Sequence, residues 1–205
     1  TLVLLVHAPR DARAIAQGDL DPQFKSYFIA NASTGLPRSE EFPADAIKDL
    51  TFTFGSPSST SGRLMPEYFI KQSTGKSAEE FFSKEVQFQK SGGHVATAEA
   101  VQAGSVQVGA INFKTYDSMV ADGKLDPEKA PIIWVTPDYA DYNLTVHGDL
   151  DKHFGEGFID KLQKVLVECE DKEVLKAFNR DKLIPAKNED FAGIEAVAKE
   201  LGLMR

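Results

Sequence analysis

The chain has 205 residues, of which 42% are hydrophobic, so it can bury the core of one large domain or of two small lobes. It carries 23 Lys and Arg against 31 Asp and Glu, a net charge of −8, and no run of more than two basic residues. This pattern excludes the basic surface that nucleic acid or an anionic membrane requires, so an anion could be bound only through local dipoles and hydrogen-bond donors.

The chain opens on "TLVLLVHA", an apolar strand pattern with no initiator methionine. A natural chain rarely begins inside a strand, so we expect an upstream portion in the natural protein. The longest apolar run, Leu2 to Val6, is far too short to span a bilayer. Cys169 is the only cysteine, which excludes a disulfide within the chain and a CxxC metal cluster, and packing on a helix is a simpler interpretation of it than a reactive thiol.

Strands and helices alternate along the rest of the chain. After a polar loop over residues 8–25, the sequence predicts strands at 26–31, 49–56, 106–113, 131–137 and 142–148. Helices are predicted from the Ser/Thr-rich stretch to about Gln72, at 77–86, at 95–104 and over most of the chain beyond Asp151. This alternation predicts an α/β fold with a largely parallel sheet.

Local patterns define two of these helices further. Ser77 is followed three residues later by Glu80, which is a capping-box pattern at a helix start. In the last third, the segment 158–168 places four apolar residues on one helical face, and Pro185 interrupts the helical region. The residues of that face are Phe158, Leu162, Val165 and Leu166.

Four hydroxyl side chains, Ser58 to Ser61, lie in "FGSPSSTSGRLMPEYFI" between a predicted strand and a predicted helix. Ser59 or Thr60 would cap this helix, and Pro66 is tolerated near its first turn. The first N–H groups of a helix have no internal partner and carry partial positive charge, so the turn could hold a tetrahedral oxyanion. A capped surface loop is the alternative interpretation.

A second polar turn, "SGGHVATAEAVQAG", also leads into a helix and carries His94 at the entry. Taken alone, a histidine in a loop is usually only solvated. In an α/β layer, however, the loops at the carboxyl ends of the strands converge on one crevice. Two helix starts with Ser, Thr and His side chains could therefore enclose one small anion.

Three stretches carry a family resemblance: "DLTFTFGSPSSTSGRLMPEYF", "GGH" followed by "AVQAGSVQVGAINFKTYD", and "IIWVTPDYADYNLTVHGDL". In order and spacing they resemble the phosphonate/phosphite substrate-binding proteins of bacterial ABC transporters, which are type II periplasmic binding proteins. The Ser-Thr-Ser-Gly run after a strand is the most specific sign, and the resemblance covers almost all of the chain. Members of this family carry a further upstream stretch that builds much of the first lobe.

The resemblance implies two α/β lobes, joined by hinge strands, that close on a ligand. Residues 1–36 would be the end of an incomplete first lobe and the outgoing hinge strand, and 37–139 the second lobe with the anion cradle. Residues 140–205 would be the return hinge strand and the C-terminal helices of the first lobe. The expected crossings are "FKSYFIAN" and "DYNLTVHG".

The resemblance also implies the ligand contacts. Ser59, Thr60 and Ser61 would hold the oxygens of a phosphonate, phosphite or related anion, and His94 would donate to them from the neighbouring turn. Asn112 stands where the family commonly has an acidic residue near the ligand, which disfavours a ligand with an ammonium group. Tyr139 would line the return crossing. Whether Phe24, Tyr27, Tyr139 and Tyr142 contact the ligand or pack the hinge is left open.

The implied protein is the solute-binding component of an ABC importer. Its partner would be the membrane permease, and it would lie in the periplasm or on a lipid anchor at the outer face of a Gram-positive membrane. No enzymatic activity, cofactor, metal or nucleic acid is expected, because there is no GxSxG elbow, P-loop or GxGxxG and no carboxylate in the cradle segments. The alternatives are an enzyme that processes phosphoesters or phosphonates in the same cradle, with or without a metal, and a protein–protein module with a passive Ser loop.

Overall fold

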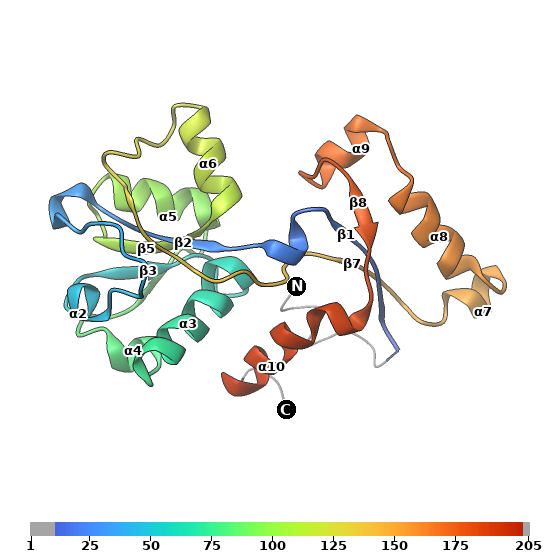
Figure 1. Cartoon of the computed structure of the whole chain (residues 1–205), viewed down its shortest axis with the longest axis horizontal. Helices are drawn as coiled ribbons and strands as arrows, with labels where there is room; N and C mark the ends of the chain where they lie inside the picture. The colour runs from blue at the N-terminus through green and yellow to red at the C-terminus, as the bar shows by residue number, and fades with distance from the viewer. Residues whose placement is uncertain (1–10, 203–205) are drawn as a thin grey trace. The chain divides into compact units, whose positions relative to one another are not determined.

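The computed structural model describes residues 11–202, which divide into two compact units. Unit 2 is Lys25–Pro137, and unit 1 is made of the described parts of Thr1–Phe24 and Asp138–Arg205 (Figure 1). The strand predicted at the start of the chain lies outside the described residues. The sequence placed the second lobe at 37–139, whereas the contacts assign residues 25–36 to unit 2 as well, because the strand they contain pairs in the middle of its sheet. That these units are the two lobes of a clamp stays a prediction.

Unit 2 contains a five-stranded sheet in the order β4-β3-β5-β2-β6. β3 runs parallel to β4 and β5, whereas β2 runs antiparallel to both β5 and β6. The expectation of a largely parallel sheet is therefore wrong. The strands are β2 Ser26–Ala30, β3 Phe52–Phe54, β4 Gln87–Phe88, β5 Val108–Asn112 and β6 Ile132–Val135.

Helices cover both faces of this sheet. Figure 1 shows α2 (Ala44–Ile47), α3 (Met65–Thr74) and α4 (Ala78–Phe81) over one face and α5 (Gly93–Gln102) and α6 (Phe113–Ala121) over the other. Side chains of a strand alternate between faces, so Phe28 and Ala30 join the core under α2–α4 while Ile29 joins the core under α5 and α6. The capping box of Ser77 and Glu80 is confirmed at α4, although that helix is shorter than predicted.

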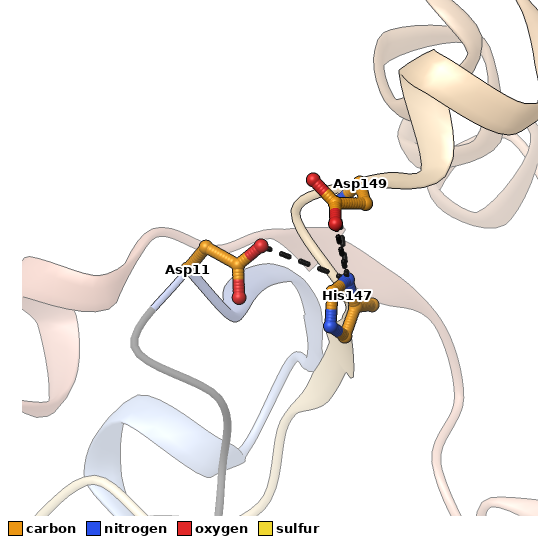
Figure 2. A group of neighbouring side chains, drawn as sticks. All are labelled: Asp11, His147 and Asp149. Carbon is orange, nitrogen blue, oxygen red and sulfur yellow. Dashed lines mark hydrogen bonds and ion pairs between the residues drawn. The ribbon is translucent and has the colours of Figure 1, made fainter.

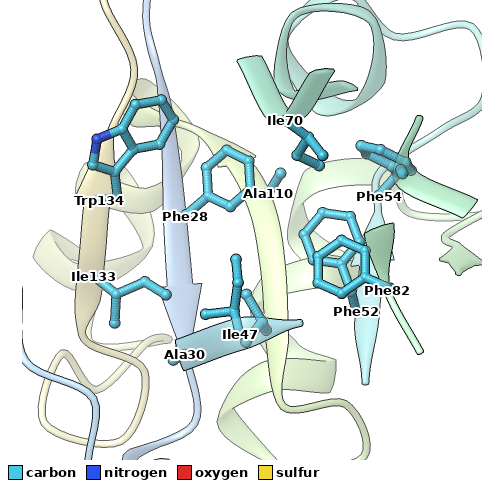
Figure 3. Close-up of a cluster of buried hydrophobic side chains, with 12 residues drawn as sticks. Phe28, Ala30, Ile47, Phe52, Phe54, Ile70, Phe82, Ala110, Ile133 and Trp134 are labelled. Atoms are coloured by element: carbon cyan, nitrogen blue, oxygen red, sulfur yellow. The ribbon is translucent and has the colours of Figure 1, made fainter. Parts of the chain in front are cut away.

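The core on the α2–α4 side is largely aromatic. Phe52 stacks on Phe82 with ring centroids 4.5 Å apart, and Phe28 meets Trp134 edge-on at 5.4 Å (Figure 3). Each such side chain stabilises the fold by about 1.5–3 kcal/mol on full burial. This packing fixes the strands whose carboxyl ends carry the polar turns.

Unit 1 contains a three-stranded antiparallel sheet in the order β7-β1-β8. The central strand, β1, lies at Arg13–Gly18, inside the segment predicted to be a polar loop, so that prediction is wrong. β7 and β8 pair with β1 on its two sides, and every residue of β1 except Arg13 is buried. The other elements are β7 Leu144–Val146, β8 Leu183–Pro185, α7 Leu150–Phe154, α8 Phe158–Val167, α9 Lys172–Ala177, α10 Ala192–Glu200 and the 3-10 turns Asp21–Gln23 and Asn188–Phe191.

The C-terminal helices largely follow the prediction, including the interruption at Pro185, which ends β8. The predicted apolar face of α8 needs a correction, because Val165 is 67% exposed whereas Ile159 is buried. Gln163 of the same helix donates from Nε2 to the carbonyl of Ile15, so this face of α8 lies against β1. Within residues 11–202, no helix is both long and apolar enough to cross a membrane.

Candidate functional site

Three polar turns of unit 2 follow the carboxyl ends of parallel strands, at the same end of its sheet. The parallel strands β3, β4 and β5 end at Phe54, Phe88 and Asn112, and each is followed by a helix start. Parallel strands with helical connections bring such turns together at their carboxyl ends. The first turn holds Ser59–Ser61, the second His94 and the third Asn112 itself.

Ser59 begins the first of these helices. Its Oγ accepts the N–H of Gly62 at 2.9 Å, and its carbonyl accepts the N–H groups of Arg63 and Leu64. The turn Thr60–Leu64 is π-helical and runs directly into α3, a detail that the sequence did not predict. The cap satisfies Gly62, but the first N–H groups of a helix have no acceptor within it and stay directed out of its N-terminus.

Gly62 allows the first two turns to pack against each other. A Cβ at this position would lie 2.9 Å from Cε1 of His94, closer than real Cβ atoms come, and 3.0 Å from Oγ of Ser59, which is tighter than most such contacts. Its carbonyl also accepts the N–H of Gly55 at 2.8 Å, which ties the turn to the end of β3. The glycine in the Ser-Thr-Ser-Gly run is therefore required by a close approach.

Hydrogen bonds join the three turns. Ser61 Oγ lies 3.3 Å from Nε2 of His94, and the backbone N–H of Asn112 donates to Nδ1 of His94 at 3.2 Å. Ser26, at the start of β2, donates its Oγ hydrogen to the carbonyl of Ser61 at 2.6 Å. The structure thus brings Ser61, His94 and Asn112 together, as expected if the two helix starts enclose one small ligand. Ser26 had no signal in the sequence, because it reads only as part of a strand.

Thr60 is the residue that the fold leaves unsatisfied. Its side chain is buried, at 4% exposure, and its Oγ1 has no hydrogen-bond partner among the described residues. A buried hydroxyl without a partner costs free energy, and most buried polar groups in native proteins are paired. The hydroxyl of Thr60 is therefore available to donate a hydrogen bond to a ligand beside the helix start.

The electrostatics of this group are those of neutral donors. Burial lowers the pKa of His94 to about 4, so the ring is uncharged at neutral pH. Arg63, the cation nearest in sequence, is paired with Glu67 at 2.9 Å and lies over the ring of Phe88. Burial raises the pKa of Glu67. The groups that this site offers to a ligand are thus hydroxyls, N–H groups and helix dipoles.

Asn112 has a structural task that sequence reasoning missed. It is the N-cap of α6, and its Oδ1 accepts the N–H of Thr115 at 2.7 Å. The sequence did not predict α6, which also carries Asp117, a carboxyl whose pKa is raised by burial. Asn112 is buried, and its amide oxygen is already engaged as an acceptor.

The predicted aromatic residues lie in both units. In unit 1, Tyr139 is buried and forms a two-way backbone bridge with Phe24, whose ring centroid is 6.2 Å from its own. Tyr142 is 49% exposed and lies under the guanidinium of Arg180. In unit 2, Tyr27 packs on Tyr116 at 5.5 Å. The role of Tyr139 as a ligand contact stays a prediction.

A different cluster, in unit 1, consists of Asp11, His147 and Asp149 (Figure 2). Their candidate ligand atoms lie within 4.8 Å of one another, but the side chains of Asp11 and His147 are about half exposed. Asp149 is ion-paired with Lys152, which holds the pKa of that carboxyl below its usual value. His147 Nδ1 accepts the N–H of Asp149. Lys152 and the backbone N–H of Asp149 thus already contact one carboxylate oxygen of Asp149 and Nδ1 of His147.

Comparison with known proteins adds to this geometry. The family model described as "ABC transporter, phosphonate, periplasmic substrate-binding protein" matches residues 1–191. The "Probable ABC transporter phosphite binding protein PhnD1" of Prochlorococcus marinus (strain MIT 9301) is 36% identical over 197 residues, 93% of this chain and 65% of that protein. The "Phosphonates-binding periplasmic protein" of Escherichia coli (strain K12) is 29% identical over 58% of this chain and 33% of that protein. The chain thus spans less than two thirds of these relatives.

Solved structures confirm the α/β fold predicted from the sequence. PhnD1 of P. marinus in complex with methylphosphonate superposes with a TM-score of 0.82 at 35% identity, covering 94% of this chain and 72% of that one. A binding protein component of an ABC phosphonate transporter from Pseudomonas aeruginosa gives a TM-score of 0.65 at 20% identity, covering 91% and 61%. The second likeness concerns the fold alone.

Proposed function

Because the chain belongs to the family of periplasmic substrate-binding proteins of phosphonate ABC transporters, we propose that it is the solute-binding component of an importer and that unit 2 holds a phosphorus oxyanion at the Ser59–Ser61 turn. The observation that carries this placement is the buried Oγ1 of Thr60, which has no partner in the described residues. An oxyanion oxygen at the helix start would accept that hydroxyl together with the free N–H groups of the turn.

The binding mode follows from the donors present. Ser59 is used as the cap, so its contribution to the anion comes through the backbone that it fixes. Thr60 and Ser61 offer hydroxyls, and the dipoles of the converging helices favour negative charge. Such a site of neutral donors would hold the anion through hydrogen bonds and helix dipoles, without a cationic side chain.

The wider role is part of the same proposal. The family consists of binding proteins rather than enzymes, which favours capture and delivery over turnover in the cradle. The partner would be the permease of the importer, and the site of action would be the periplasm or the outer face of the membrane. The ligand would be phosphite or a short phosphonate, since one relative of known structure is in complex with methylphosphonate.

The test is calorimetry of the protein in its full natural length with phosphite, phosphate, methylphosphonate and 2-aminoethylphosphonate. We expect saturable binding of at least one compact anion, no release of product over a no-protein blank, and loss of binding when Ser61 and Thr60 are both replaced. Binding that survives this double replacement would place the ligand elsewhere. Metal-dependent turnover would instead favour an enzyme.

A further inference from the structure

We infer that Arg180 is a positioning residue for ligand capture: from the turn between α9 and β8, it holds together the two segments by which the chain leaves and re-enters unit 1. The chain passes into unit 2 after Phe24 and returns at Asp138. Residues 21–24 and 138–142, next to these passages, are here called the outgoing and the return segment. The effect on affinity rests on the proposed function, whereas the effect on the two segments can be measured without a ligand.

Backbone hydrogen bonds pair the two segments with each other. The N–H of Phe24 donates to the carbonyl of Tyr139 at 3.0 Å, and the N–H of Tyr139 donates back at 2.9 Å. The N–H of Asp141 donates to the carbonyl of Asp21 at 3.1 Å. A strand pair as short as this is at best marginally stable by itself in water, so its surroundings must stabilise the pairing.

The side chain of Arg180 contacts both segments. Its Nε and Nη2 donate to the two carboxylate oxygens of Asp21, with 3.1 Å between Nε and Oδ2. Its guanidinium carbon lies 5.6 Å from the ring centroids of both Phe24 and Tyr142, one ring from each segment. Asp21 and Arg180 are 2% and 9% exposed, so water and salt screen these contacts little. One cation thus bridges the outgoing and the return segment.

Two backbone features allow Arg180 to reach this position. Asn179 has a φ of 53°, the only positive φ among the non-glycine residues that the structure describes, and its carbonyl accepts Nη1 of Arg180 at 2.8 Å. At Gly18, a Cβ would lie 2.4 Å from Cγ and Cδ of Arg180, so only glycine leaves room for this side chain. Left-handed residues other than glycine cost free energy and persist only where the surrounding structure requires them. The turn is therefore built to direct Arg180 toward the two segments.

A purely stabilising ion pair is the alternative role. Burial costs both charges their hydration, so a buried pair is weak evidence for stability. A planar guanidinium that donates twice to one carboxylate instead fixes the orientation of its partner. We therefore assign to Arg180 the geometry of the two segments, and we expect its loss to weaken ligand capture even in a protein that stays folded.

The consequence for affinity follows from the number of arrangements available to the empty protein. The two units are expected to close on the anion, and the chain connects them only through these segments. Segments that move separately would let the ligand-free protein populate more arrangements, of which few can bind. The apparent affinity falls in proportion to the fraction that is competent. The anion turn itself would be unchanged, because it belongs to unit 2.

Arg180→Lys and Gly18→Ala break the contact in two different ways, and Arg13→Lys, at an exposed position of β1, is the matched control. Lysine keeps the charge beside Asp21 but loses the paired donors and the planar face, whereas a Cβ at position 18 displaces Arg180 without removing its charge. The assay is calorimetry of the full-length natural protein with methylphosphonate, at a temperature where every variant is folded. We expect about five- to tenfold weaker binding in the first two variants and no change in the control. Wild-type affinity in both would overturn the inference.

Amide hydrogen exchange of the ligand-free protein measures the two segments directly. In both variants the amides of Phe24, Tyr139 and Asp141 should exchange about tenfold faster or more. The amide of Thr136, which donates to the carbonyl of Ser26 within unit 2, should keep its wild-type rate. Equal acceleration at all four amides would show a general loss of stability and overturn the inference, as would unchanged rates in the two segments. If wild type binds no anion but the exchange pattern is as expected, the proposed function fails and the assignment of Arg180 stands.

Discussion

Replacing Thr60 by valine would remove one hydroxyl and keep the shape of the side chain. The Thr60 side chain is 4% exposed, and its Oγ1 has no partner in the part of the chain that the structure describes. The hydroxyl therefore costs desolvation free energy in the empty protein and regains it only when an acceptor arrives. Thr60→Val should consequently move stability and affinity in opposite directions.

The magnitudes follow from the same hydroxyl. An unsatisfied buried hydroxyl costs roughly 1–3 kcal/mol, so the free energy of unfolding of the ligand-free variant should rise by about 1 kcal/mol or more. A hydrogen bond to a charged group contributes roughly 1.5–3 kcal/mol, so affinity for the anion should fall ten- to a hundredfold.

Urea unfolding and calorimetry measure the two quantities, and Thr53→Val provides the matched control. Thr53 is also fully buried in unit 2, but its Oγ1 donates to the carbonyl of Phe54 and accepts from Gln89 Nε2. The control should therefore lose stability, by about 0.5–1.5 kcal/mol, with little change in affinity. A Thr60→Val protein that loses stability in the same way, or binds as wild type does, would show that the hydroxyl is not reserved for the ligand.

Three further predictions concern neighbours of Thr60. Gly62→Ala should lower the free energy of unfolding by about 1–3 kcal/mol and remove most of the binding, because the added Cβ would meet His94 and Ser59. The control Gly193→Ala has open space around the added Cβ and should be neutral or mildly stabilising in thermal unfolding. Because the folded pKa of His94 is about 4, the unfolded chain binds a proton there between pH 6.5 and about 4 that the folded protein does not. The free energy of unfolding of wild type should fall relative to His94→Gln as pH is lowered through that window, by up to about 3 kcal/mol, and parallel urea curves would contradict this. In a competition between methylphosphonate and 2-aminoethylphosphonate, Asn112→Asp should shift binding toward the amine. The control Gln72→Glu adds the same charge in the exposed last turn of α3 and should cause no shift. Equal shifts in both variants would mean that the side chain at position 112 does not contact the ligand.

The helix starts that the sequence predicted correctly depend only on contacts between residues close together in the chain. Ser59 caps the cradle helix and Ser77 with Glu80 forms a capping box, because each depends on contacts within a few residues. The missed strand β1 depends on partners far away: Arg13–Gly18 contains two alanines and a single β-branched residue, and it is a strand because β7 and β8 pair with it.

Strand direction was mispredicted for a related reason. An apolar run such as Ser26–Ala30 predicts burial of the strand but not its direction in the sheet, and β2 runs antiparallel to both β5 and β6. The hydrogen bond from Ser26 to Ser61 depends on that direction, since it places the start of β2 beside the end of β5, at the same end of the sheet as the Ser59–Ser61 turn. The error in the sheet and the missing residue of the site thus have one cause.

Two requirements act on the side chain of Asn112: it caps α6, and its chemical type matters for the proposed ligand. The segment Asn112-Phe113-Lys114-Thr115 lacks the Glu or Gln three residues after the cap, so the capping-box rule gave no helix there. An asparagine caps α6 as well as an aspartate would, which leaves the fold indifferent between them. The choice between amide and carboxylate is therefore free to follow the ligand. Since Oδ1 is already held by the N–H of Thr115, what this amide has left to offer is its NH₂, a donor suited to an anion and not to an ammonium group.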